Sequence, residues 1–210
     1  MTTPTLLTFA RLALIPVLLL VYYLPVPWAG PAAAAVFAAA GATDWLDGYL
    51  ARRLNQTSPF GAFLDPVADK LMVAVALVLL VQTHPTVWMA LPAAVIIGRE
   101  IAVSALREWM AELGSRARVA VSLLGKYKTA FQMTAIILLL YGRPLGGLPT
   151  QAAGLALLYA AVALTLWSMA VYLRAAWPLL APGAGGRPGG RVGVDKAAGL
   201  DRMIRSDRRE

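Results

Sequence analysis

Six long apolar segments, separated by short turns, dominate this sequence of 210 residues. A helix needs roughly 20 residues to cross the hydrocarbon core of a bilayer, and each segment is long enough to do so. We expect the spans at about residues 5–24, 31–54, 66–83, 86–113, 119–141 and 149–177. The sequence therefore predicts an all-α, polytopic integral membrane protein with six transmembrane helices.

The composition excludes other broad classes of protein. Apolar residues (AVILMFWYC) make up 59% of the chain and charged residues 14%, against about 25% charged residues in an average soluble domain. The mean hydropathy of +0.66 also excludes disorder for most of the chain. Cysteine is absent and His84 is the one histidine, so any chemistry must rely on carboxylates, lysines, arginines or hydroxyls. His84 falls in a predicted outer loop, where we expect a plain surface residue.

The net charge of +8 does not indicate a nucleic-acid partner, because the charges are divided between two parts of the chain. We expect one six-helix membrane domain over residues 1–180, followed by a flexible, basic, Gly/Pro-rich tail over residues 181–210. The tail holds seven basic and four acidic residues, and it could touch anionic lipid or simply be solvated. The loops after the first and third spans carry no Lys or Arg. The positive-inside rule therefore places both termini in the cytoplasm.

Four aspartates stand out in the membrane domain: Asp44, Asp47, Asp65 and Asp69. An ionised side chain near the centre of a membrane helix costs at least about 2.5–3.5 kcal/mol, so the cluster needs a functional explanation. Asp44 and Asp47 share one face of a helix, as do Asp65 and Asp69 on the next. We expect the two helices to be antiparallel neighbours whose carboxylates converge near the cytoplasmic interface.

Four converging carboxylates repel one another unless cations neutralise them. Ligation by oxygen alone selects hard ions such as Mg²⁺ or Mn²⁺. Four aspartates suit two ions about 3.5–4 Å apart, an arrangement that supports displacement at phosphorus. Gly48 and Ala51 lie on the same helical face as Asp44 and Asp47. Such small residues permit close helix packing, but between metal-binding aspartates we favour a groove for a nucleobase or diphosphate.

The pattern Asp-x2-Asp-Gly-x2-Ala-Arg-x8-Gly-x3-Asp-x3-Asp contains Asp44, Asp47, Gly48, Ala51, Arg52, Gly61, Asp65 and Asp69. It resembles the complete signature of the CDP-alcohol phosphatidyltransferases. Further resemblance lies in Pro4-Thr-Leu-Leu-Thr-Phe-Ala-Arg11, in Ala105-Leu-Arg-Glu-Trp-Met-Ala-Glu-Leu-Gly114 and in Gly125-Lys-Tyr-Lys-Thr129. These flanking segments are similar to those of bacterial family members that use glycerol 3-phosphate as acceptor. The resemblance covers most of residues 3–178.

The resemblance implies transfer of a phosphatidyl group from CDP-diacylglycerol to sn-glycerol 3-phosphate, giving phosphatidylglycerol phosphate and CMP. It implies that Asp69 is the general base, and that Asp44, Asp47 and Asp65, with Asp69, hold two Mg²⁺ or Mn²⁺ ions. It assigns the CDP moiety to Asp44, Gly48, Ala51, Arg52 and Gly61. Arg52 could equally be an interfacial arginine that extends toward water. A homodimer in the bacterial inner membrane, in contact with membrane lipid, is also implied only by the resemblance.

A phosphorylated acceptor requires a cationic pocket. The candidates near the cytoplasmic side are Arg107, Arg116, Arg118, Lys126 and Lys128. We favour Lys126 and Arg107, whereas Arg116 and Arg118 are equally well explained as positive-inside charges. Glu100, Ser104 and Arg107 form one stripe of the fourth helix, which would also be compatible with an internal Glu–Arg pair.

Two alternatives remain open at this stage. Another family member would use inositol phosphate, serine or phosphatidylglycerol as acceptor. A cation transporter would use the aspartates as a transport site, and it would be expected to show broken helices in two related halves and ionisable residues near mid-membrane. The clustering of the aspartates toward one side, in one half of the chain, favours the enzyme.

Overall fold

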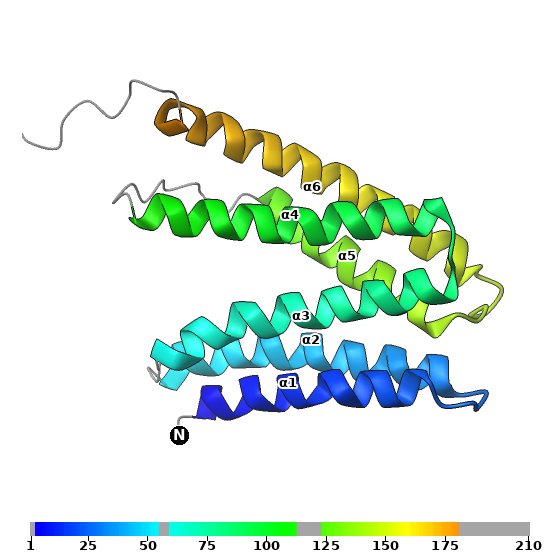
Figure 1. Ribbon diagram of the computed structural model, residues 1–210. Coiled ribbons are helices and arrows are strands. Elements are labelled where there is room, and N and C mark those ends of the chain that lie inside the picture. Colours follow the sequence, from blue (N-terminus) through cyan, green and yellow to red (C-terminus); the bar gives the residue numbers. More distant parts are fainter. Residues whose placement is uncertain (1–2, 55–58, 113–122, 181–210) are drawn as a thin grey trace, which may run out of the picture. The chain divides into compact units, whose positions relative to one another are not determined.

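The computed structural model describes residues 3–54, 59–112 and 123–180 (Figure 1). Within these ranges the chain is all-helical and contains no strand. The helices are α1 (Thr3–Tyr22), α2 (Ala29–Leu54), α3 (Pro59–Thr83), α4 (Val87–Glu112), α5 (Leu123–Tyr141) and α6 (Thr150–Leu180). Over the described residues the all-α prediction is confirmed, and the six helices there overlap the six expected spans.

The start of the third helix was predicted wrongly. The span was expected to begin at about residue 66. The structure instead begins α3 at Pro59 and keeps Pro66 inside the helix. Gly61, Asp65 and Asp69 therefore all belong to one helix, which carries the second half of the aspartate pattern.

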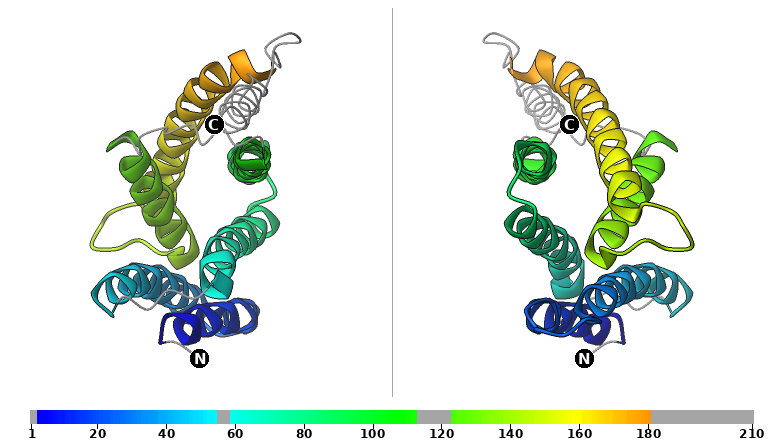
Figure 2. Two further views of the ribbon diagram at one scale, coloured as in Figure 1. Left: turned by 90° about the vertical axis from the view of Figure 1, so that its left-hand side faces the viewer. Right: turned by 90° about the vertical axis from the view of Figure 1, so that its right-hand side faces the viewer.

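Successive helices run in alternating directions (Figure 1). The amino ends of α1, α3 and α5 consequently lie at the same end of the bundle as the carboxyl ends of α2 and α4. Helix α1 packs against α2 and α3, α2 packs against α5, and α3 packs against α4, as the end-on views show (Figure 2). Alanines and Phe37 of α2 fill the core together with leucines of α1 and α3.

Within the described parts of the chain, two helices contain segments that are long and apolar enough to cross a membrane. They are Val87–Leu106 of α4 and Thr150–Val171 of α6, and Thr8–Tyr22 of α1 is a shorter apolar segment. Large apolar side chains are also exposed on the outside of the bundle, among them Leu20 and Ile101. These features indicate membrane association.

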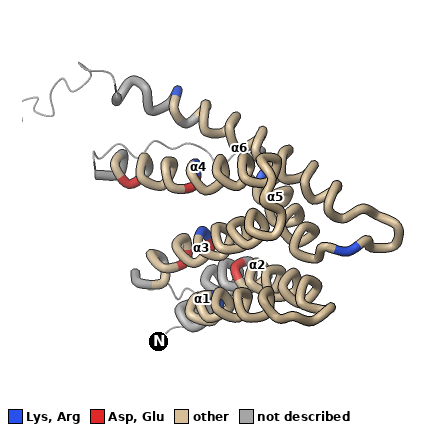
Figure 3. Tube along the Cα trace, turned by 45° about the vertical axis from the view of Figure 1, so that its right-hand side comes forward, with Lys and Arg blue, Asp and Glu red and all other residues tan. Residues whose placement is uncertain are grey.

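The chain forms two compact units, Met1–Tyr172 and Leu173–Glu210. The described part of the second unit is the last portion of α6, and the predicted tail over residues 181–210 lies outside the described residues. Within the first unit, the described charges gather toward one end of the helices, apart from a basic residue in the α5–α6 loop (Figure 3). That residue is Arg143, which donates a hydrogen bond to the carbonyl of Pro27.

His84 was expected to be a plain surface residue of an outer loop, and its position in a loop is confirmed. It lies in the short α3–α4 connection, but its side chain is only partly exposed. Its Nε2 is 3.0 Å from the amide nitrogen of Gln151 at the start of α6. This contact with the first turn of α6 accounts for the partial cover of a loop residue.

Candidate active site

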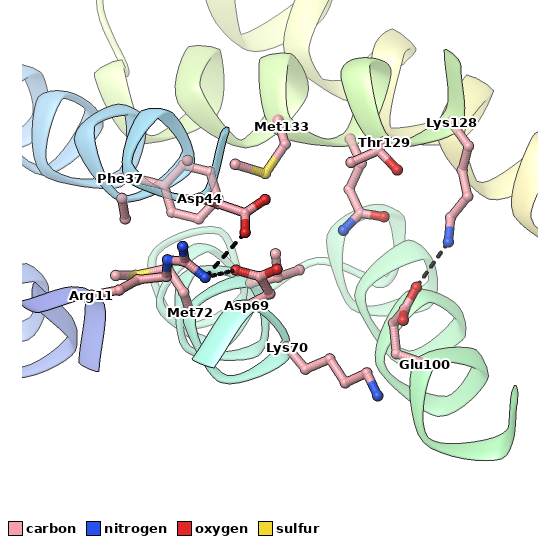
Figure 4. Close-up of a pocket in the computed structure, with 14 residues that line it drawn as sticks. Arg11, Phe37, Asp44, Asp69, Lys70, Met72, Glu100, Lys128, Thr129 and Met133 are labelled. Atoms are coloured by element: carbon pink, nitrogen blue, oxygen red, sulfur yellow. Dashed lines mark hydrogen bonds and ion pairs between the residues drawn. The ribbon is translucent and has the colours of Figure 1, made fainter. Parts of the chain in front are cut away.

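A cavity of about 280 Å³ opens between α1, α2, α3, α4 and α5 (Figure 4). Its apolar wall includes Phe37, Met72 and Met133. Its polar lining consists of Arg11, Asp44, Asp69, Lys70, Glu100, Lys128, Thr129 and Gln132. The cavity thus places two of the four pattern aspartates in one chamber with three basic side chains.

Arg11 of α1 joins the two halves of the aspartate pattern. Its Nη1 lies 2.6 Å from Oδ1 of Asp69 on α3 and 3.2 Å from Oδ1 of Asp44 on α2. The Arg11 side chain is 1% exposed, whereas those of Asp44 and Asp69 are 50% and 44% exposed. One buried guanidinium therefore holds two accessible carboxylates toward the cavity, and charge-assisted contacts of this kind are among the stronger polar interactions in proteins.

The third described aspartate of the pattern is also held by α1. The buried Thr8 hydroxyl donates a hydrogen bond to Oδ1 of Asp65. Thr8 and Arg11 are three residues apart on α1, and Asp65 and Asp69 are four apart on α3, so each pair shares one helical face. The two faces meet in register, and α1 consequently orients both α3 carboxylates.

A second polar cluster lies on the α4 side of the cavity. Glu100 accepts hydrogen bonds from Arg99 Nη1 at 2.5 Å and from Lys128 Nζ of α5 at 2.8 Å. Lys70 of α3 donates to the hydroxyl of Ser104, which in turn donates to the carbonyl of Glu100. These contacts fix two lysines at the cavity wall. In the close-up view Lys128 lies across from the aspartates, whereas Lys70 follows Asp69 on α3 and points toward α4 (Figure 4).

The other predicted site residues are only partly accounted for. Asp47, Gly48, Ala51 and Arg52 belong to α2, Arg107 to α4 and Lys126 to α5, but their side chains lie outside the described part of the structure. Arg116 and Arg118 fall in residues 113–122, which are not described at all. Gly61 is buried in the first turn of α3. Of the predicted phosphate-binding cations, Lys128 is the one whose described side chain lines the cavity.

The described side chains do not form a group of three acidic or imidazole residues close enough to hold a metal ion. The side chain of Asp47, the fourth expected ligand, lies outside the described residues. The described donors do have the right chemistry, because Asp44, Asp65 and Asp69 provide only carboxylate oxygens, the ligands that Mg²⁺ and Mn²⁺ prefer. The two that line the cavity are partly exposed and therefore accessible from it.

Sequence reasoning did not assign Arg11, Thr8 or Lys70 to the site. A signal existed for Arg11, since it is the only charged residue in the first apolar segment, and a charge at membrane depth indicates function. Thr8 and Lys70 carry no comparable signal. The role of Thr8 depends on which face of α1 packs against α3, and the role of Lys70 depends on which face of α3 packs against α4.

The sequence profile of the family described as CDP-alcohol phosphatidyltransferase matches residues 1–167. The chain belongs to this family. The whole cavity described above lies within the matched residues, and the family generally depends on divalent metal ions.

Relatives within the CDP-alcohol phosphatidyltransferases are highly similar over nearly their whole length. A protein of Pseudomonas fluorescens named CDP-diacylglycerol–glycerol-3-phosphate 3-phosphatidyltransferase is 61% identical over 181 residues, which cover 86% of this chain and 92% of that protein. The protein of the same name from Escherichia coli (strain K12) is 57% identical over 173 residues, covering 82% of this chain and 93% of the relative. Both names state the donor and the acceptor of the transfer.

Proposed function

We propose that this chain transfers the phosphatidyl group of CDP-diacylglycerol to the 1-hydroxyl of sn-glycerol 3-phosphate. The observation that carries the proposal is the polar lining of the cavity, where Asp44 and Asp69 lie on one side and Lys128 on the other, while Lys70 points from α3 toward α4. A phosphorylated alcohol has one group for each side: the hydroxyl for the carboxylates and the phosphate for the Lys128 ammonium group. The names of the similar proteins supply the same donor and acceptor.

The reaction is a displacement at phosphorus. The acceptor hydroxyl oxygen attacks the phosphorus that carries the diacylglycerol, and the bond from this phosphorus to the CMP oxygen breaks. Asp69 accepts the hydroxyl proton, and CMP leaves with the bonding electron pair. Products are phosphatidylglycerol phosphate and CMP. A positioned base such as Asp69 typically contributes about 10²–10⁴ to the rate.

Asp44, Asp47, Asp65 and Asp69 are the residues that would hold two Mg²⁺ or Mn²⁺ ions. Such ions, when bound, offset the charge of the diphosphate and of the departing CMP. Thr8 and Arg11 orient three of these carboxylates before any ion arrives. Side chains of α1, a helix outside the aspartate pattern, therefore orient the carboxylate oxygens that α2 and α3 provide.

The CDP moiety is assigned to the helices that carry the pattern. Asp44, Gly48, Ala51 and Arg52 of α2 and Gly61 of α3 are the proposed contacts, since small residues there allow a flat base to approach the backbone. Glycerol 3-phosphate is assigned to the opposite wall. Lys128 is the described contact there. The other proposed contacts, Arg107, Arg116, Arg118 and Lys126, precede it in the sequence between α4 and the start of α5.

The proposed setting is the bacterial inner membrane, crossed six times, with both termini in the cytoplasm. The gathering of charges at one end of the first unit supports this orientation (Figure 3), because positive residues favour the cytoplasmic side. The cavity lined by Asp44 and Lys128 would then lie near the inner interface, where it can meet a soluble acceptor and a lipid donor. We further propose a homodimer surrounded by membrane lipid, with residues 181–210 as a flexible cytoplasmic tail.

The test is an acceptor comparison with the purified full chain in detergent. CMP release from CDP-diacylglycerol is measured with glycerol 3-phosphate, inositol phosphate, serine or phosphatidylglycerol, each with Mg²⁺, Mn²⁺ or excess chelator. We expect release with glycerol 3-phosphate and a divalent ion, together with phosphatidylglycerol phosphate as the lipid product. Faster release with another acceptor would overturn the assigned acceptor, and full activity in chelator would overturn the metal assignment.

A further inference from the structure

Arg11 occupies an unusual place for a charged side chain in this bundle. Its guanidinium lies between α2 and α3, and one nitrogen, Nη1, contacts carboxylate oxygens of both Asp44 and Asp69. The close-up shows this group at the meeting point of the three helices (Figure 4). Its side chain is 1% exposed, so the charge is almost completely removed from solvent.

Burial of a charge is costly unless nearby opposite charges and hydrogen bonds compensate for it. Asp44 and Asp69 provide that compensation, and the guanidinium in turn reduces the repulsion between them. Lys70, the next residue after Asp69, does not take this place, because its ammonium donates to Ser104 toward α4. The two carboxylates and Arg11 therefore form a compact ionic unit that spans α1, α2 and α3.

We propose that Arg11 is a built-in counter-ion, which holds the aspartates of α2 and α3 together in the metal-free protein and competes with metal ions for them. This inference rests on the proposed function, in which the same carboxylates bind divalent ions. A cation that uses the Oδ1 atoms of Asp44 and Asp69 must share them with Nη1 or displace it. Arg11 thus keeps the oxygens of the site in place and at the same time weakens its affinity for ions.

Three measurable consequences follow from a counter-ion that competes with metal. Without metal, loss of Arg11 leaves the carboxylates of α2 and α3 uncompensated, so the bundle becomes less stable. With metal, the ions supply the missing positive charge, so most of that stability returns. The affinity for metal itself rises, because no guanidinium then competes for the oxygens. A purely structural arginine would give the first effect without the other two.

The experiment compares three variants of the full chain, purified in detergent, with the native protein. Arg11→Gln removes the positive charge, and Arg11→Lys keeps the charge but replaces the planar guanidinium by an ammonium group. Arg143→Gln is the matched control, which removes an arginine at the other end of the bundle. The melting temperature is measured by intrinsic fluorescence in excess chelator and in saturating Mn²⁺. The dissociation constant for Mn²⁺ is measured by electron paramagnetic resonance of the free ion, without substrate.

For Arg11→Gln in chelator we expect a melting temperature about 5–10 °C below that of the native chain. In saturating Mn²⁺ at least half of this deficit should disappear. The Mn²⁺ dissociation constant should fall about tenfold, by analogy with proton binding, where one nearby charge changes the affinity of a carboxylate by about tenfold or more. Arg143→Gln should leave both the metal-induced stabilisation and the Mn²⁺ affinity at their native values.

An equal loss of stability with and without Mn²⁺, or an unchanged or weaker Mn²⁺ affinity, would overturn the inference. If Arg11→Gln does not fold, Arg11→Lys decides the matter. Its single ammonium should compete less well, so Mn²⁺ should bind about threefold more tightly, and unchanged binding would reject the counter-ion role. Failure of the native chain to bind Mn²⁺ at all would overturn the proposed metal site as well as the inference.

Discussion

Lys128 of α5 lies 2.8 Å from Glu100 of α4, and both side chains line the cavity that contains Asp44 and Asp69. Glu100 also binds Arg99, so it is shared by two cations. The Lys128 ammonium is therefore held at a fixed place on the wall facing the carboxylates. This arrangement makes Lys128 the described side chain best placed to meet the phosphate of an acceptor.

The first prediction concerns Lys128→Gln. Loss of the ammonium should raise the KM for glycerol 3-phosphate by about tenfold, the loss expected when a charge-assisted contact to phosphate is removed. The KM for CDP-diacylglycerol should change less than twofold, because that substrate is assigned to α2 and α3. Steady-state CMP release, with each substrate varied in turn, provides the measurement. Equal increases in both KM values would contradict the assignment.

The second prediction concerns Asp69→Asn. The amide keeps the shape of the carboxylate but is a far weaker base, so kcat should fall by about 10²–10⁴. Binding of CDP-diacylglycerol and part of the Mn²⁺ binding should remain. Asp195→Asn, in the predicted tail, is the matched control and should retain native kcat. Near-native turnover of the Asp69 variant would exclude this residue as the base.

The third prediction concerns Thr8→Val, which removes the hydroxyl that donates to Asp65. Since hydrogen bonds to charged groups contribute about 1.5–3 kcal/mol, the melting temperature should fall by about 3–10 °C. The concentration of Mg²⁺ for half-maximal activity should rise, because Asp65 is less firmly oriented. Both quantities can be measured on the same detergent preparation.

Thr165→Val serves as the control for that variant. Thr165 is also fully buried, but its hydroxyl oxygen has no hydrogen-bond partner within the described residues. Replacement of an unsatisfied buried hydroxyl by a methyl group should leave stability unchanged or increase it slightly. A Mg²⁺ requirement that rises equally in the two variants would show that threonine loss acts through packing rather than through Asp65.

The fold could be predicted largely from the sequence, because apolar segments of membrane-spanning length leave few alternatives. The start of α3 was misplaced, since Pro59 rather than Pro66 lies at the start of the helix. Local spacing also indicated that Asp65 and Asp69 share a face. The partner of Asp69 could not be predicted in this way, since Arg11 is 58 residues away in the sequence.

The basic side of the site was predicted less well for the same reason. The sequence placed Lys128 among several cations but indicated no partner for it. Which of these cations reaches the cavity depends on the rotation of α5 against α4, and the pair between Lys128 and Glu100 is the result of that rotation. Helix periodicity specifies the residues that share a face, but it does not specify the face of the neighbouring helix that they meet.

The last prediction concerns Gly30, where α2 passes close to the end of α5. A Cβ atom at this position would lie 2.9 Å from the backbone oxygen of Leu140 and 3.1 Å from that of Tyr141. Because backbone cannot move aside as a flexible side chain does, Gly30→Ala should separate the two helices and lower the melting temperature by about 3–10 °C. Gly98→Ala on α4 is the control, since a Cβ atom there meets nothing within 4 Å, and it should melt at or above the native temperature. Equal melting temperatures for the two variants would show that α2 and α5 do not approach this closely.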